Sequence, residues 1–235
     1  MTGHVPGPIT IVPLLGVPEV RPGDDLARLL GDALERAGGL ARGDVVVVAH
    51  KVVSKAEGRL ERAEDELAVG LREARAVRRR RGEFVIAETE HGFVCASAGV
   101  DHSNAPGEGV LVLLPRDPDA SARALRSALG ARFGSTPGVV VSDSFGRPWR
   151  RGTTDVALGV AGLAPLLDLR GTTDAAGREL RSTLVAVADE LAGAAELVMG
   201  KASAIPAVRI RGYPTPAGEG GARELVMPRE RDLFP

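Results

Sequence analysis

Residues 45–59 read VVVVAHKVVSKAEGR, and this stretch indicates the fold class. Its first part, Val45–Ala49, is a short continuous apolar run, which is typical of a strand buried on both faces of a sheet. Polar side chains follow the run directly, from His50 to Arg59, and we interpret them as a loop. The stretch therefore predicts an α/β fold of the mixed α+β kind.

A second apolar run has the same character. Val139–Val141 predicts another buried strand, and residues 142–152, SDSFGRPWRRG, predict a polar loop at its carboxyl end. In α/β sheets, ligands gather beyond the carboxyl ends of the strands. We therefore expect the polar segments after both strands to contribute to one binding site.

The remaining elements follow from periodicity and capping signals. Further strands are expected at 9–15, 84–87, 92–96, 109–114 and 207–211. Helices are expected at 26–36 after a cap at Asp24 or Asp25, from a cap at Asp119 or Ser121 to about Leu129, and at 179–199. Residues 61–82 predict a solvated helix with the basic run Arg78–Arg81 at its exposed end. Residues 155–165 fit either a strand or a short helix, and the absence of repeats and linkers predicts one continuous unit.

Composition excludes several classes of protein. Thirty Lys and Arg residues against 31 Asp and Glu residues leave a formal charge of -1, which gives no overall attraction to nucleic acid or to an anionic membrane. Cys95 is the only cysteine, so an intrachain disulfide is impossible. The apolar stretch 9–20 is short and broken by prolines, so we expect no signal peptide or membrane span and a cytoplasmic location.

The standard short motifs for phosphate, dinucleotide and zinc binding are absent. What remains is a set of polar loops after apolar runs, at 16–20, 50–59, 101–104, 143–152 and 200–206. Asp101 and Asp143 supply carboxylates and Ser144 a hydroxyl, which are the hard oxygen ligands that Mg²⁺ or Mn²⁺ prefers. A single Asp in a turn is more often a cap than a ligand, so the prediction of a metal site depends on the loops taken together.

Basic side chains in these loops favour a phosphate ligand. Lys55 follows a strand by about one turn, where an ammonium group neutralises nucleotide phosphates and the charge that develops in phosphoryl transfer. The three arginines at positions 147, 150 and 151 fit a clamp for phosphate or carboxylate, with surface ion pairs as an equal alternative. Trp149 beside them is interpreted as a core residue. His50, His91 and His102 lack the spacing of a zinc site and are assigned ordinary polar roles.

Taken together, these loops resemble those of the coenzyme F(420)-0:gamma-glutamyl ligase family. The blocks that carry the resemblance are GVPEVRPGDD at 16–25, KVVSKAEGR at 51–59, AGVDHSN at 98–104, LPRDPD at 114–119, SDSFGRPWR at 142–150, VADELA at 187–192 and GK at 200–201. They cover nearly the whole chain in order, and the resemblance is strongest to the N-terminal domain of the two-domain actinobacterial enzymes.

The resemblance implies a gamma-glutamyl-ligase fold and an intimate homodimer with its cleft near the subunit contact. It also implies a GTP site formed by Val17, Pro18, Glu19, Val20, His50, Lys55, Asn104 and Lys201, with metals at Asp101, Asp143 and Ser144. Among these residues, Lys55, Asp101 and Asp143 are the expected catalytic residues. Two divalent ions, Mg²⁺ or Mn²⁺, are expected, and K⁺ is left open as a further ion.

Three positions depart from the pattern of the family. His50 stands where a small hydroxyl residue is usual, which puts the contact with the nucleotide in question. Ser144 replaces Thr and keeps the hydroxyl, and Thr153 replaces a Gln common in the bacterial relatives.

The implied reaction transfers the γ-phosphate of GTP to a carboxylate of the deazaflavin F(420)-0. The amine of L-glutamate then attacks the acyl phosphate, which forms a gamma-glutamyl amide and releases phosphate and GDP. Two alternatives stay open: an amide ligase for another small carboxylic acid, and a nucleotide-binding module without turnover. The ligase domain is expected at 1–212 and a tail at 213–235, and the chain is either a stand-alone ligase or lacks the second flavin domain of the two-domain relatives.

Overall fold

The computed structural model describes residues 7–233, so residues 1–6 and 234–235 of the two expected units lie outside the described residues. Within the described part, the main sheet has the strand order β1, β12, β2, β8, β9. These strands are β1 (Thr10–Pro13), β12 (Ala207–Arg211), β2 (Val45–Ala49), β8 (Gly138–Arg147) and β9 (Arg150–Ala161). In this sheet β2 and β8 pair in parallel and the other neighbours pair antiparallel. The carboxyl ends of β2 and β8 are therefore adjacent, with Ala49 opposite Ser142.

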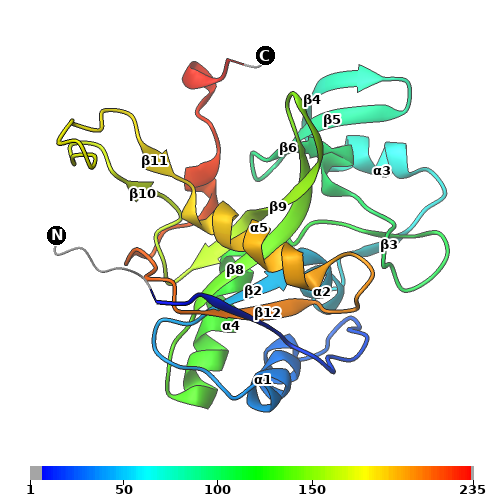
Figure 1. The fold of residues 1–235 in the computed structure, drawn as a ribbon. Coiled ribbons are helices and arrows are strands. Elements are labelled where there is room, and N and C mark those ends of the chain that lie inside the picture. The colour runs from blue at the N-terminus through cyan, green and yellow to red at the C-terminus, as the bar shows by residue number, and fades with distance from the viewer. Residues whose placement is uncertain (1–6, 234–235) are drawn as a thin grey trace.

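Helices cover both faces of this sheet. Helices α1 (Leu26–Arg36) and α4 (Pro118–Phe133) lie on one face, and α5 (Val187–Met199) crosses the other (Figure 1). Val46 and Val48 pack in one core with α1 and α4, and Val45 and Val47 pack in a second core with α5. The prediction that residues 45–49 form a strand buried on both faces is confirmed.

A smaller lobe lies beyond the carboxyl ends of β2 and β8 (Figure 1). Helix α2 (His50–Ala56) leads towards it and packs in the same core as α1. The elements of the lobe are β3 (Leu60–Arg62), α3 (Glu66–Glu73), β4 (Ala74–Arg81), β5 (Phe84–Thr89), β6 (Val94–Ala96), η1 (Ser97–Gly99) and β7 (Val110–Val112). Strands β4, β5 and β6 form an antiparallel sheet, and β3 pairs with β7. This lobe has its own small cores around Val69 and Val85.

Several sequence predictions are confirmed. Asp25 caps α1 through a hydrogen bond from the Arg28 backbone N–H, and the expected strands at 84–87, 92–96 and 207–211 are present. The undecided stretch 155–165 is mostly strand, because β9 runs to Ala161. The cap of α4 was predicted at Asp119 or Ser121, but Asp117 accepts the capping hydrogen bond and Pro118 takes the first position of the helix.

The helix predicted at residues 61–82 is wrong. Only α3 is helical there, and the basic run Arg78–Arg81 lies in strand β4. β4 pairs antiparallel with β5, and Arg78 donates to the buried carboxylate of Glu88 on that neighbouring strand. The partner that stabilises this arginine comes from elsewhere in the chain, so local composition could not indicate it.

Three further predictions need correction. Residues 50–56 are helix α2 rather than a loop, and the polar segment 142–152 continues β8 into a long hairpin with β9. The helix predicted at 179–199 begins only at Val187. Before that residue the chain forms β11 (Leu184–Val185), which pairs with β10 (Leu167–Asp168), and the backbone N–H of Leu169 donates to the carbonyl of Thr183.

The C-terminal segment contains the short helices η2 (Ala222–Leu225) and η3 (Arg229–Arg231), and Ala222 of η2 is fully buried. The Asp119 carboxylate accepts hydrogen bonds from the backbone N–H groups of Val160 and Ala222, at 2.7 Å and 2.9 Å. This one side chain therefore ties the segment to strand β9. Within residues 7–233, no helix is long and apolar enough to cross a membrane.

The contact between α4 and β9 generates the first prediction. A Cβ atom at Gly159 would overlap the backbone carbonyl of Pro118, whereas a Cβ atom at Gly146 of the same hairpin would meet nothing within 4 Å. Because backbone cannot yield as a flexible side chain does, Gly159→Ala should lower the free energy of unfolding by about 2 kcal/mol. Urea denaturation measures this change. Gly146→Ala is the matched control, and equal stability of both variants would contradict the close packing.

Candidate active site

A pocket of about 610 Å³ lies beside the carboxyl end of β2, near the junction of the main sheet and the smaller lobe. Four segments far apart in the sequence form it: the loop after β1, helix α2, the loop after residue 101 and the turn after α5. Its lining includes Val17, Pro18, Glu19, Val20, Lys55, Asn104 and Lys201. The structure thus brings together every residue expected to bind the nucleotide except His50.

Lys55 reaches this pocket from the last turn of α2. Its side chain is 6% exposed, and its Nζ donates to Oε1 of Glu19 at 2.5 Å. Glu19 is 60% exposed, so this partner is well solvated. Because Lys55 is buried, its ammonium group needs a counter-charge, and an incoming anion can supply one as the solvated Glu19 side chain moves into water.

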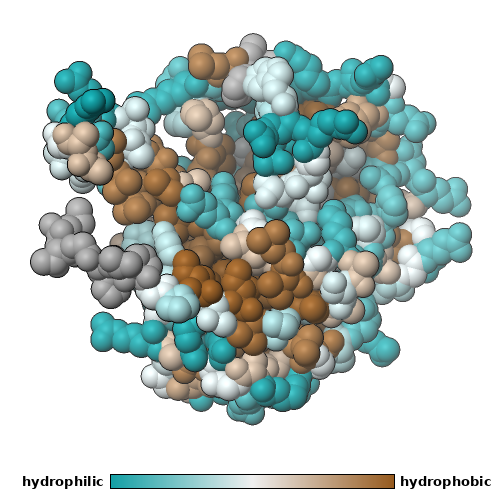
Figure 2. Space-filling model, in the orientation of Figure 1, coloured by the Kyte–Doolittle hydropathy of each residue, from teal (hydrophilic) through white to brown (hydrophobic). Residues whose placement is uncertain are grey.

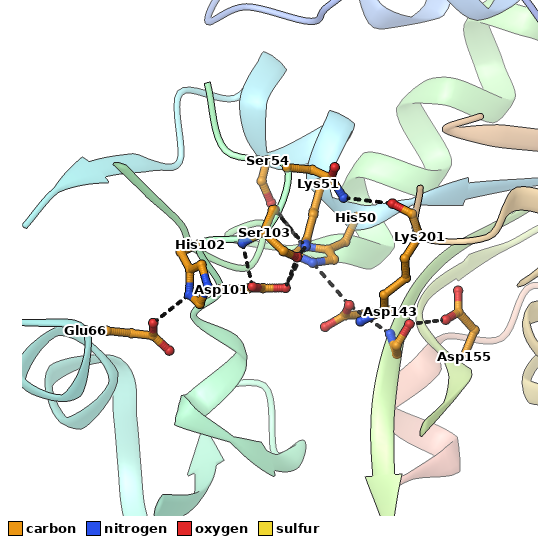
Figure 3. A network of polar contacts seen from close by, with 12 residues as sticks. His50, Lys51, Ser54, Glu66, Asp101, His102, Ser103, Asp143, Asp155 and Lys201 are labelled. Atoms are coloured by element: carbon orange, nitrogen blue, oxygen red, sulfur yellow. Dashed lines mark hydrogen bonds and ion pairs between the residues drawn. The ribbon is translucent and has the colours of Figure 1, made fainter. Parts of the chain in front are cut away.

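Lys51 lies one turn earlier on α2, so it faces the same side of the helix as Lys55. Its Nζ donates to Oδ2 of Asp101 at 2.5 Å and to the backbone carbonyl of Ser103 at 2.9 Å (Figure 3). The sequence analysis did not single out Lys51, although its spacing of four residues from Lys55 was a usable signal. Lys51 lines the large pocket and also the smaller pocket described below.

Asp101 is fixed by three donors. Besides Lys51, the backbone N–H and the hydroxyl of Ser103 donate to its two carboxylate oxygens at 2.7 Å and 2.8 Å. Burial raises the pKa of Asp101, but the hydrogen bonds from Lys51 and Ser103 outweigh it and lower the pKa to about 2. The carboxylate is therefore charged and held in one orientation.

Asp143 lines the smaller pocket, about 70 Å³, which adjoins the large one at Asn104 and Lys201. Its Oδ1 lies 3.3 Å from Nε2 of His50, whose side chain is 1% exposed. On the other side of the ring, Nδ1 of His50 lies 3.4 Å from the Ser54 hydroxyl. The structure thus places His50 against a predicted metal ligand, in the wall of the smaller pocket.

Asp155 and Glu196 belong to this smaller pocket and were missed by the sequence analysis. Oδ1 of Asp155 accepts from the Ser144 hydroxyl at 2.6 Å, and Oδ2 accepts from the Ser142 hydroxyl at 2.8 Å. Burial raises the pKa of Asp155, and burial together with the charge of Asp155 raises that of Glu196. No sequence signal marked Asp155, because the stretch around it was undecided between strand and helix.

The donor set suits a hard divalent cation in part. Figure 3 shows Asp101 and Asp143 on the two sides of His50 and Lys51, with Asp155 beyond Asp143. Within the described residues, no group of three or more His, Cys, Asp or Glu side chains is already arranged as a metal cage. Mg²⁺ and Mn²⁺ commonly use one or two carboxylates and complete their coordination with water and phosphate oxygens. Asp143, Ser144 and Asp101 therefore fit a cation that arrives with a phosphorylated ligand.

The other predicted residues lie elsewhere. Arg147, Arg150 and Arg151 are exposed at the end of the β8–β9 hairpin and line neither pocket. Trp149 is 81% exposed in the turn of this hairpin, so its interpretation as a core residue is wrong. His91 contacts the carbonyl of Arg116 and His102 contacts Glu66, which agrees with ordinary polar roles for both.

Fold and site together define a class of protein. It is an α/β protein that gathers lysine ammonium groups and hard oxygen donors beyond the carboxyl ends of adjacent parallel strands, as phosphate-handling enzymes do. The family model for F(420)-0:gamma-glutamyl ligase matches residues 15–68 and 63–212.

Relatives over most of the chain agree with this match. A coenzyme F(420):L-glutamate ligase of Methanothermobacter thermautotrophicus is 43% identical over 251 residues, covering 96% of this chain and 98% of the relative. The protein of the same name from Methanopyrus kandleri is 44% identical, covering 92% and 93%, and that from Methanocaldococcus jannaschii is 42% identical, covering 82% and 84%. The chain belongs to the F(420)-0:gamma-glutamyl ligase family, which confirms the resemblance found in the sequence.

The contact between Lys51 and Asp101 generates the second prediction. Lys51→Met removes the ammonium group, so the pKa of Asp101 should rise from about 2 towards the ordinary value of about 3.9. Because the native pKa lies below the unfolded one, the pair stabilises the fold above about pH 4 and this stability is lost as the pH falls through about 2. NMR titration of the side-chain carboxyl carbon measures the shift. Lys201→Met serves as the control, and an unchanged midpoint in Lys51→Met would contradict the assignment.

Proposed function

We propose that the protein joins L-glutamate to F(420)-0 in a GTP-dependent reaction that passes through an acyl phosphate. The observation that carries the proposal is the large pocket, because four distant segments converge to form it and supply all but one of the residues expected to bind the nucleotide. Family membership and the names of the relatives support the choice of F(420) and L-glutamate as substrates. Extension of the proposal to a homodimer is supported by exposed apolar surface: Figure 2 shows an apolar area over the C-terminal part of α5 and over β1, and Leu197 of α5 is 87% exposed.

The nucleotide occupies the large pocket in this proposal. The loop from Val17 to Val20 offers backbone groups to the base, and Pro18 restricts the shape of that loop. Asn104 takes a left-handed backbone conformation, with φ of 57°, and its Nδ2 donates to the carbonyl of Lys201 at 3.3 Å. This hydrogen bond joins two walls of the pocket, so the loop that contains Asn104 and the turn after α5 both contact the ligand in this proposal.

Lys55 neutralises the phosphates once a phosphate oxygen replaces Glu19 as its partner. Lys51 keeps its ion pair with Asp101 in this proposal. Its ammonium group also donates to the Ser103 carbonyl, and the backbone N–H of Ser103 holds the same carboxylate in place. The two lysines thus have different tasks. Lys55 meets the charge that develops as the phosphoryl group moves, and Lys51 keeps Asp101 oriented.

A divalent cation would be held by Asp143, Ser144 and Asp101, and when bound it offsets the repulsion between nucleotide phosphates and an acceptor carboxylate. Asp155 accepts the hydrogen bond of the Ser144 hydroxyl, which leaves the lone pairs of that oxygen available for a ligand. His50 lies against Asp143 and restricts the position of its carboxylate.

The bond changes of the proposed reaction balance as follows. An acceptor carboxylate oxygen attacks the γ-phosphorus of GTP, and the bond to the β-phosphate oxygen breaks to release GDP. The amine of L-glutamate then attacks the acyl carbon, loses a proton and displaces phosphate. Both steps need anionic groups to approach each other, which is the arrangement that the lysines and oxygen ligands of this site favour.

A ligation assay tests this function. Incubation with F(420)-0, GTP, Mn²⁺ and L-glutamate should add the mass of one or more glutamyl units and produce GDP, as measured by mass spectrometry. ATP in place of GTP should give a much lower kcat/KM, because the loop at 17–20 is expected to bind the guanine edge. Ligation to another carboxylic acid alone would favour a recruited amide ligase, and binding without turnover would favour a regulatory module.

The proposed role of Lys55 generates a further prediction. Lys55→Met should lower kcat at saturating GTP by roughly two to three orders of magnitude, because a charge-assisted contact of a few kcal/mol is lost in the transition state. Steady-state kinetics at saturating metal measures the effect. Arg62→Met removes an exposed cation whose contact is the Glu108 carbonyl, and it should change kcat less than about twofold. A wild-type kcat in Lys55→Met would remove this residue from the mechanism.

A further inference from the structure

A second large groove, of about 700 Å³, lies between the small antiparallel sheet, the β8–β9 hairpin and the C-terminal segment. We call it the arginine groove, and its lining includes Arg75, Arg78, Arg223, Arg229, Phe93 and Phe145. The residues expected to bind the nucleotide and those expected to bind the metal do not line this groove. A volume of this size suits a ligand as large as a cofactor and exceeds what one amino acid needs.

The groove carries an excess of positive charge. The buried carboxylate of Glu88 forms ion pairs with three arginines: Arg78, Arg229 at 3.4 Å and Arg75 at 3.7 Å. Burial raises the pKa of Glu88, but the charges and hydrogen bonds of Arg78 and Arg229 outweigh it and lower the pKa, so one full negative charge faces three guanidinium groups. Arg223 has no ion pair within the described residues.

The other carboxylates of the groove do not cancel this excess. Four arginines line it against Glu88, Asp189 and Asp232. Asp189 accepts the backbone N–H of Ala157 at 2.9 Å, and burial raises the pKa of this carboxyl. The groove is therefore suited to an anionic ligand, because guanidinium groups bind phosphate and carboxylate with charge-assisted hydrogen bonds.

Aromatic side chains form part of the groove wall. The rings of His91 and Phe93 stack at 5.6 Å with an angle of 18°, and Phe145 meets Phe93 edge-on at 6.4 Å. The contact between Nε2 of His91 and the carbonyl of Arg116 fixes the stack. In a chain with 3% aromatic residues, this gathering is a specific feature, and it gives the groove an apolar aromatic wall against which a planar ring system can pack.

The register of the β8–β9 hairpin connects this groove to the proposed metal site. Asp143 and Phe145 are two residues apart on β8, so their side chains lie on the same face, about 7 Å apart along the strand. Val156 on β9 is the cross-strand partner of Asp143, and it lines the groove together with Phe145. A ligand in the groove therefore lies on the face of the hairpin that carries Asp143.

We propose that the arginine groove binds the acceptor of the ligation, a flat and anionic heteroaromatic cofactor. Its ring system lies against Phe93 and Phe145, and its acidic groups are bound by Arg75 and Arg223. The chain end that receives glutamate then extends along β8 towards Asp143. This inference rests on the proposed function, and it gives the C-terminal segment a role in forming one wall of the acceptor site.

Direct binding of F(420)-0 tests the proposal without turnover. The intrinsic fluorescence of the deazaflavin is followed during titration with protein, in the absence of GTP and L-glutamate. The double variant Arg75→Gln, Arg223→Gln should raise the Kd for F(420)-0 by at least about tenfold, because two charge-assisted contacts are lost. Phe145→Leu should raise it about threefold or more through the loss of ring contact. GTP affinity should change less than twofold in each variant, and thermal denaturation checks that Phe145→Leu is folded.

Arg42→Gln is the matched control, because Arg42 is exposed in the loop before β2 and lines none of these pockets. If the wild type binds and ligates F(420)-0 but the double variant binds it equally well, the groove assignment is wrong and the ligase function stands. If the wild type neither binds nor ligates F(420)-0, the proposed function fails and the acceptor site fails with it. A tenfold rise in the KM for L-glutamate alone, with unchanged F(420)-0 binding, would make the groove an amino-acid site and overturn the proposal.

Discussion

The parallel pairing of β2 with β8 is the constraint on which the site depends. Its register places Ala49 opposite Ser142, so that β2 and β8 leave the sheet side by side, β2 into α2 and β8 into the hairpin with β9. The pairing needs a close approach at its other end, where a side chain at Gly138 would crowd Leu163 and Val45. Because valines fill both faces of β2, the apolar pattern alone does not set the register, and the close approach of Gly138 to its partner Val45 contributes to specifying it.

The charged groups beyond this pair differ in how firmly they are held. Asp101 accepts one hydrogen bond from Lys51 and two from Ser103, whereas Lys55 donates to the well-solvated Glu19. Groups with several hydrogen-bond donors keep their orientation before a ligand arrives, which reduces the cost of binding. A group with one exposed partner can change partners. The contrast supports a division between fixed residues that position the ligand and one lysine that follows the moving charge.

Sequence patterns predicted the elements whose signals are local. The valine run at 45–49 and the helix at 26–36 carry their burial and capping signals within a few residues, and both are present. The basic run at 78–81 was misassigned because its buried partner, Glu88, lies on another strand. Asp155 was missed for a related reason, since its importance arises only when β9 pairs with β8 and brings it to Ser142 and Ser144. The family resemblance recovered much of the pocket lining, because it carries such long-range information in its spaced blocks.

Alternation along one hairpin separates the proposed chemistry into two surfaces. Ser144 and its cross-strand partner Asp155 share one face of the β8–β9 pair, while Phe145 and Val156 share the other. Asp143 belongs to the second face by alternation, but its Oδ1 accepts a hydrogen bond from the Ser144 backbone N–H, so its carboxylate lines the same small pocket as Ser144 and Asp155. The first face supplies oxygen donors that are already hydrogen-bonded, and the second leads into the arginine groove. In the proposed reaction, Asp143 is thus the residue at which the nucleotide side and the acceptor side meet. A reaction that joins a phosphoryl group to a carboxylate requires such a meeting point, and a twisted antiparallel hairpin provides it without any additional element.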